Sequence, residues 1–281
     1  MSQLRSHQNL SSSLSDFAQL HADDRLDFQC GKELDCFTSC CRDVSILLTP
    51  YDVLRMKKAL HLDSSEFLER YAVLFLTENK LPIVLLRMNA DDKRCSLVTA
   101  EGCSIYPHRP WACRMYPLGV ARPDDPRPDE PGFYFLIREE LCHGHGKGNG
   151  CTVREWVHQE DIEAYEMMAE SFQKLMSDRF RPGHAPLSAQ QAEMYLMACY
   201  DLDRFRRFVF ETSFLTKFKV DEDRVEAIRT DDVELLEFGL SWLRFCLFGE
   251  RTMKIRGTPA AVGFVPAQGA VQPKNPEGGL R

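Results

Sequence analysis

Apolar and polar residues alternate with helical spacing in two parts of the chain, and short polar signals mark where the helices begin. Residues 49–52 read Thr-Pro-Tyr-Asp, which places an N-cap threonine, a proline at the first helical position and an aspartate at the positive helix end. This pattern predicts a short helix to about Leu60. Asp63 or Ser64 can cap a second short helix that runs through Tyr71.

Strand-length apolar runs occur at Leu81–Met88 and at Gly132–Ile137, between segments rich in Pro and Gly. The part of the chain before residue 152 is therefore expected to be α+β and rich in loops.

The following hundred residues have the periodicity of helices. Residues 152–155 form a capping-box pattern, and the sequence after them predicts a helix toward Phe180, ended by Pro182 and Gly183. Residues 188–191 repeat the pattern, so helices are expected over about 188–212 and 231–248. The apolar residues at helical spacing here are interpreted as core: Met194, Met197, Phe205 and Phe208.

Changes in composition divide the chain into four parts. Residues 1–25 are polar and serine-rich, and residues 250–281 are rich in Gly, Pro and Ala, so both ends are predicted to be flexible. Between them we expect a cysteine-cluster module over 26–151, stapled by metal, and a helical region over 152–249.

Composition narrows the classes of function. A hydrophobic share of 44% and a charged share of 27% are ordinary for a globular protein, and the net charge of −7 disfavours a nucleic-acid partner. The sequence has no export signal at its start and no apolar stretch long enough to span a membrane. We therefore expect a cytoplasmic protein without membrane contact, whose cysteines act as thiolate ligands or redox groups.

Nine of the eleven cysteines lie within residues 30–151, in segments without a clear apolar period. Such segments are where ligands occur when a metal replaces a missing core. The predicted ligands are Cys30, Cys36, Cys40, Cys41, Cys95, Cys103, Cys113, Cys142 and Cys151. Cys199 and Cys246 lie among apolar residues of predicted helices and are expected to fill the core.

The adjacency of Cys40 and Cys41 limits the assignment, because neighbouring side chains point in different directions. The two thiols are expected to bind different metals or different atoms of a polynuclear cluster, unless one of them is a reactive or supporting thiol. Two four-coordinate sites would use eight of the nine cysteines, and mixed sites could include His108, His143 or His145.

Arginines flank one of these cysteines. Arg109 and Arg114 surround Cys113, where they can lower thiol pKa and stabilise thiolates, the role we favour, or simply form surface ion pairs. Together with His108, they are predicted to support the ligands from outside the metal's coordination shell.

Residues 103–117, Cys-Ser-Ile-Tyr-Pro-His-Arg-Pro-Trp-Ala-Cys-Arg-Met-Tyr-Pro, follow the earlier pattern Cys36-x3-Cys40-Cys41 and the Leu-Thr-Pro-Tyr-Asp run at 48–52. Together they resemble the YkgJ-like cysteine-cluster family, over about residues 30–151. The resemblance implies zinc or iron chelation by the nine cysteines. Flagellin lysine N-methylases carry a similar cysteine region, so the resemblance also extends to protein modification.

The spacing leaves the metal and its use open. Zinc would add folding energy, whereas iron, alone or in an iron-sulfur cluster, would add redox capacity, and the high thiolate count slightly favours iron. A radical S-adenosylmethionine site is disfavoured because Asp43 stands where it needs a cysteine. The alternatives are a metal-binding module that presents its C-terminal helices to a protein partner, a metal-dependent protein-modifying enzyme, and a metal-free redox pair at Cys40 and Cys41.

Overall fold

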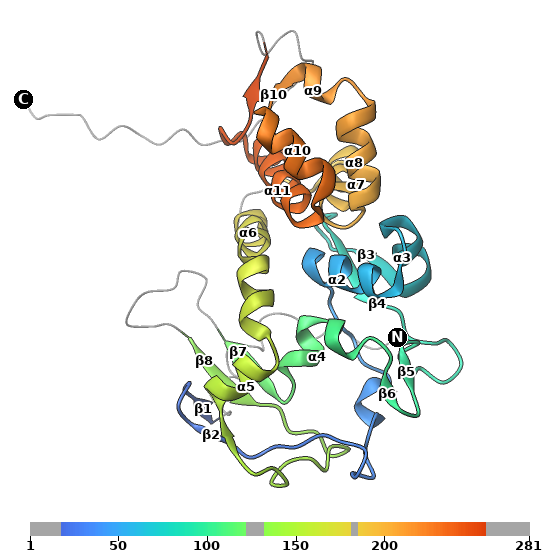
Figure 1. Cartoon of the computed structure of the whole chain (residues 1–281), viewed down its shortest axis with the longest axis vertical. Coiled ribbons are helices and arrows are strands. Elements are labelled where there is room, and N and C mark those ends of the chain that lie inside the picture. The colour runs from blue at the N-terminus through green and yellow to red at the C-terminus, as the bar shows by residue number, and fades with distance from the viewer. Residues whose placement is uncertain (1–17, 122–131, 181–184, 257–281) are drawn as a thin grey trace, which may run out of the picture. The chain divides into compact units, whose positions relative to one another are not determined.

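The computed structural model describes residues 18–121, 132–180 and 185–256 (Figure 1). Within these residues the fold is α+β, with small sheets and a helical C-terminal part. The chain divides into two compact units: residues 1–61, 70–73 and 84–169 form unit 1, and residues 62–69, 74–83 and 170–281 form unit 2. Residues 1–17, 257–281, Pro182 and Gly183 lie outside the described residues, so the predictions made for them stay predictions.

Unit 1 contains short strands in antiparallel pairs and a few helices. Its elements are β1 Gln19–Leu20, β2 Arg25–Leu26, the 3-10 helix η2 Ser39–Cys41, α2 Pro50–Leu60, β5 Val98–Thr99, β6 Gly102–Cys103, the 3-10 helix η3 Tyr106–His108, α4 Trp111–Met115, β7 Leu118–Ala121, β8 Phe133–Leu136, β9 Cys151–Thr152 and α5 Val153–Gln159. One sheet has the order β1-β8-β7, while β2 pairs with β9 and β5 with β6. Residues 18–25, predicted to be flexible, contribute β1 and the start of β2.

A small apolar cluster supports this end of unit 1. Its buried members are Leu26, Phe28, Met115, Leu118, Val153, Val157 and Ile162. The ring of Phe28 lies 5.8 Å from that of Tyr116 and 5.5 Å from that of Trp156, both near perpendicular. This cluster therefore anchors β2, α4 and α5 to one another.

The predicted first helix is α2. The residues that cap it also position α4, the helix that contains Cys113. Thr49 is the predicted N-cap, and together with Asp52 it forms a capping box. Asp52 is fully buried, and its second carboxylate oxygen accepts the backbone N–H of Trp111 at 2.8 Å. One aspartate thus holds the N-termini of both α2 and α4.

The elements that follow α2 belong partly to unit 1 and partly to unit 2. They are α3 Ser64–Tyr71, β3 Ala72–Leu76, β4 Pro82–Leu86 and α6 Ile162–Phe180. Helix α3 and strands β4 and β8 confirm the predicted elements at these positions. The predicted continuous helix from residue 152 to Phe180 was wrong: the chain forms α5 and α6, separated at Asp161, whose φ is 55°. An aspartate in the left-handed region ends α5 without a glycine or proline to signal it.

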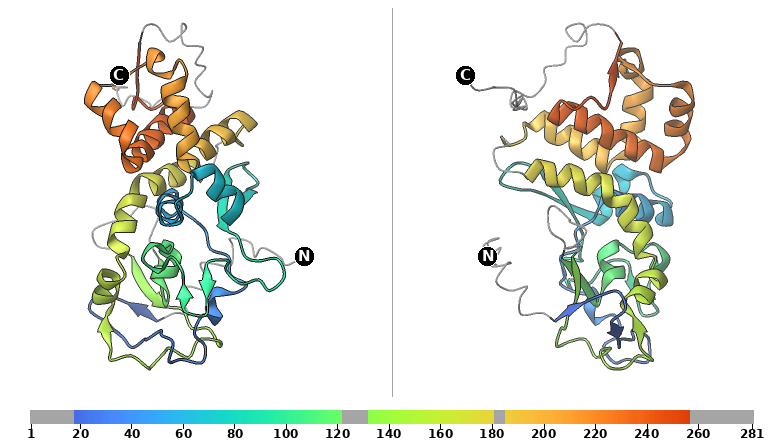
Figure 2. Two further views of the ribbon diagram at one scale, coloured as in Figure 1. Left: turned by 45° about the vertical axis from the view of Figure 1, so that its right-hand side comes forward. Right: turned by 90° about the vertical axis from the view of Figure 1, so that its left-hand side faces the viewer.

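Unit 2 is mostly helical, as Figures 1 and 2 show. Its elements are α7 Ala189–Cys199, α8 Leu202–Glu211, α9 Phe214–Lys217, β10 Phe218–Lys219, α10 Glu222–Thr230, α11 Asp232–Phe248 and β11 Lys254–Ile255. Helix α11 confirms the expected helix at 231–248. The helical segment expected over 188–212 contains two helices, because α7 ends at Cys199 and α8 begins at Leu202.

Aromatic side chains fill the core of unit 2. Phe205 and Trp242 stack at 5.5 Å, and Phe214 contacts Phe218 at 4.7 Å. Met197 and Cys199 are buried, as the core interpretation requires. Strand β11, inside the segment predicted to be a flexible tail, pairs antiparallel with β10.

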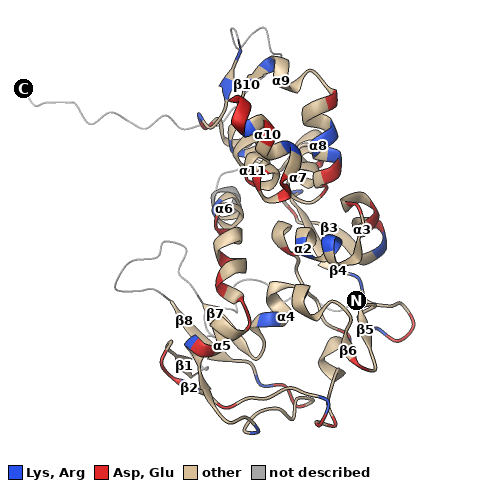
Figure 3. Cartoon of the chain, in the orientation of Figure 1, with Lys and Arg blue, Asp and Glu red and all other residues tan. Residues whose placement is uncertain are grey.

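Charges of both signs are interspersed along the ribbon of each unit (Figure 3). Among the described residues, no helix combines the length and the apolar character that a membrane span requires.

Candidate metal centre

Strand register brings Cys30 next to Cys142. Leu26 pairs with Cys151, Phe28 bridges to His145, and the N–H of Gln29 donates to the carbonyl of Gly144 at 3.1 Å. Continuing this antiparallel register by one or two residues places Cys30 opposite residues 142 and 143.

A turn adds Cys36 and Cys40 to this pair. The backbone N–H of His143 donates to Sγ of Cys36 at 3.3 Å, which joins the turn to the segment after β8. Within the turn, the N–H of Ser39 donates to the carbonyl of Cys36 and opens η2, which contains Cys40. We call Cys30, Cys36, Cys40 and Cys142 set A.

The electrostatics of Cys30 agree with this grouping. Burial, and then the neighbouring thiols of Cys40, Cys36 and Cys142, raise its pKa from 9.0 to about 11. Thiolates at such a position repel one another, so their joint ionisation needs a cation among them.

A second group forms around Cys41 and Cys95. The N–H of Cys95 donates to the carbonyl of Cys41 at 2.8 Å, beside a bridge between Arg42 and Arg94. Cys103, in β6, lies across a tight hairpin, where it pairs with Val98.

Cys113, in α4, completes this second group. Burial, and then the thiols of Cys95 and Cys103, raise its pKa to about 12. We call Cys41, Cys95, Cys103 and Cys113 set B. Backbone N–H groups of Leu97 and Ile105 face the sulfurs of Cys95 and Cys103, where they oppose the increase of pKa that burial causes.

The two sets meet at the adjacent cysteines. A hydrogen bond between the thiols lowers the pKa of Cys40 to about 7 and raises that of Cys41. The pair therefore loses a first proton easily, from Cys40, and retains the second proton on Cys41. The two sulfurs lie in contact, although each one faces a different set.

Cys151 is the predicted ligand that the structure does not bring to either set. It pairs with Leu26, four positions before Cys30 on the neighbouring strand, which corresponds to about 13 Å. Its charged neighbours are Glu155 and Arg25 rather than other thiols.

Arg109 supports set B. Its guanidinium forms a buried ion pair with Glu160, lies 3.7 Å from the ring centre of Tyr106, and lowers the pKa of Cys103 and Cys113 against burial. The electrostatic role expected for it stays a prediction.

Arg114 instead organises the backbone. It is 4% exposed and donates to the carbonyls of Arg109 and Glu160, at 3.0 and 2.7 Å, and to the hydroxyl of Tyr165 at 3.2 Å. Its contacts hold the loop between Cys103 and Cys113 in shape.

The three histidines have separate surroundings. Arg55 lies 3.1 Å from Nδ1 of His108, and burial, followed by Arg55, lowers the pKa of that histidine. His145 packs on Phe28 at 5.2 Å. Only His143 adjoins a cysteine set among the described contacts, with its Nδ1 2.6 Å from Asp35.

Two residues near the sets were missed from the sequence, Asp35 and Glu160, and Tyr116 lies beside Cys142. Burial and the adjacent Cys142 raise the pKa of Tyr116. The position of Asp35 next to Cys36 was a local signal. No local signal indicated Glu160, because it lies 51 positions from Arg109, its ion-pair partner.

The donor groups fit zinc or iron. Each set offers four thiols, the number that closed zinc sites and common iron-sulfur clusters use. N–H groups and a buried guanidinium, which offset thiolate charge, lie beside them.

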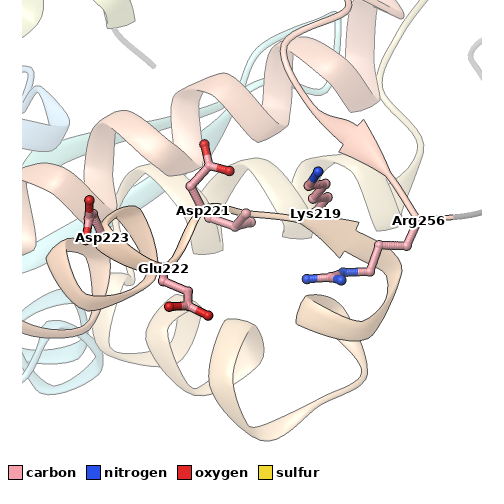
Figure 4. A pocket seen from close by; sticks show the side chains of 6 residues that line it. Lys219, Asp221, Glu222, Asp223 and Arg256 are labelled. Atoms are coloured by element: carbon pink, nitrogen blue, oxygen red, sulfur yellow. The ribbon is translucent and has the colours of Figure 1, made fainter.

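A hollow in unit 2 is unrelated to the cysteines. It is lined by Lys219, Val220, Asp221, Glu222, Asp223 and Arg256 (Figure 4). Three carboxylates and two cations share this hollow, and no thiol lines it.

Residues 29–143 match the CxxCxxCC family model. Its description is "Putative zinc- or iron-chelating domain", and the match confirms the resemblance found in the sequence. The CxxCxxCC segment covers less than half of the 281 residues, but it contains all eight cysteines of sets A and B. Comparison with curated proteins gave no match, and neither did comparison with solved structures.

Proposed function

We propose that this protein is a metal-binding protein in which set A and set B each hold a metal centre, joined at Cys40 and Cys41. The observation that carries the proposal is the sorting of eight cysteines into two groups of four. The family description supports chelation of zinc or iron in general.

The segments that contain set A support a structural role for the metal. From Gln29 to Leu47 no residue is buried, and between Ile137 and Cys151 the only buried residue is Gly144. Apolar packing therefore cannot hold these loops together, and metal bonds would replace it. When bound, zinc would supply folding energy, and iron would in addition supply a redox function.

Anaerobic purification of the full chain, followed by metal analysis and a visible spectrum, tests this proposal. A coloured protein with iron and sulfide in stoichiometric amounts indicates iron-sulfur centres. A colourless protein with two zinc ions indicates two tetrahedral sites. A folded protein without stoichiometric metal contradicts the proposal.

Single Cys→Ser variants test the sorting into sets. Cys142→Ser is expected to lose the centre of set A, and Cys103→Ser that of set B. Cys151→Ser is the matched control and is expected to keep the full metal content. Equal loss in all three variants would contradict the assignment.

Two wider expectations from the sequence stay predictions. A protein-modifying activity similar to that of flagellin lysine N-methylases would require binding of S-adenosylmethionine, which calorimetry can measure. A protein partner for the C-terminal helices would be tested by crosslinking with the full chain.

A further inference from the structure

Asp35, Cys36 and His143 form a mixed group of donors at the edge of set A. One donor atom from each residue, a carboxylate oxygen, a sulfur and a ring nitrogen, lies within 4.8 Å of the other two. Nδ1 of His143 is 2.6 Å from the Asp35 carboxylate, and the His143 N–H donates to Cys36.

This spacing suits a metal ion. Ligand atoms around a tetrahedral zinc or iron ion are separated by about 3.3 to 3.8 Å, given bonds of about 2.0 to 2.3 Å. A small movement of exposed side chains would bring the three donors into that range, with the proton between Asp35 and His143 displaced.

The donor side chains of this group are exposed to solvent, unlike the ion pair that lies beside set B. The side chains of His143 and Asp35 are 53% and 79% exposed. In contrast, Arg109 and Glu160, beside set B, are 10% and 16% exposed. An ion from solvent therefore reaches the mixed group without any opening of the fold.

A closed site at set A would not need the carboxylate of Asp35 or the imidazole of His143. Set A already offers four thiols, so a tetrahedral ion there has no place for His143 or Asp35. Cys36 belongs to both groups and can hold an ion while its remaining ligands change.

We propose that Asp35, Cys36 and His143 form a receiving site through which a divalent metal ion enters and leaves set A. This inference rests on the proposed function, because it requires a metal at set A. The three donors hold the ion during entry and exit, and the four thiols of set A hold it in between.

The test follows transfer of the bound metal from the full-length protein to an excess of a chromophoric chelator of that metal. The wild-type protein is expected to release metal in a fast phase from set A and a slow phase from set B. His143→Ala and Asp35→Asn are expected to slow the fast phase on the order of tenfold, with the metal content unchanged.

His158→Ala is the matched control. His158 and Glu163 form another exposed pair, with side chains 82% and 64% exposed, at 3.7 Å. Loss of the His158 side chain is expected to leave both phases unchanged.

Each other outcome has a defined meaning. Faster release from His143→Ala would show that His143 is a permanent ligand, and an unchanged rate would show an ordinary ion pair; either result overturns the inference alone. Absence of metal from the wild-type protein overturns the proposed function.

Discussion

At the scale of single residues, Asp52 combines burial with several hydrogen bonds. Its carboxylate accepts the Thr49 N–H at 2.7 Å, the Thr49 hydroxyl at 2.8 Å and the Trp111 N–H. Burial nevertheless dominates and raises its pKa from 3.8 to about 6. The folded state therefore binds a proton more tightly here than the unfolded state does.

The pH dependence of stability follows from the direction of this pKa change: protonation of Asp52 favours the folded state. Stability from protonated Asp52 is fully present below pH 3.8 and is lost as the pH rises through about 6, in total about 3 kcal/mol. We expect the difference in free energy of unfolding between wild type and Asp52→Asn to fall over this window. Denaturant titrations of both proteins at each pH would measure it, and a rise would show that the three donors outweigh burial.

At the scale of elements, helix caps were the most predictable features. Thr49, Thr152 and Ser188 all cap the helices that their sequences indicate. A cap depends only on residues within one turn, so the sequence contains the whole signal.

Removal of one capping side chain should destabilise only the helix that it caps. We expect Ser188→Ala to destabilise α7 by about 1 kcal/mol, because the N–H of Gln191 loses its acceptor. Ser188→Asp keeps an acceptor and serves as the control. Hydrogen exchange of α7 amides would detect the change, and equal protection in both variants would contradict it.

Features that depend on distant residues could not be predicted. The breaks at Asp161 and after Cys199 involve no glycine or proline, so the sequence there contains no usual signal for a helix end. The number of cysteines indicated two sets of four, but their membership depends on strand register. The pairing of Leu26 with Cys151 moves that cysteine away, and no local pattern encodes this pairing.

At the scale of the whole molecule, the two units should respond differently to metal removal. Unit 2 has an aromatic core, whereas the cysteine loops of unit 1 have almost no buried side chains. We expect a strong chelator to open protease sites in residues 29–47 and 137–151 and to leave α7, α8 and α11 protected. Mass spectrometry of limited digests would locate the cuts, and identical digests with and without chelator would contradict this.

The pairing of Gln29 with Gly144 has an architectural consequence. It places the first and last residues of the CxxCxxCC segment side by side, with β2 and β9 continuing outward as a two-stranded stem. A segment whose entry and exit adjoin can occupy a surface loop of an unrelated host without separating the host's own strands. The ends of the CxxCxxCC segment meet this condition, but residues 62–69 and 74–83 within it belong to unit 2, where Ser64 donates to Asp203, so the segment as a whole is not a separate insert.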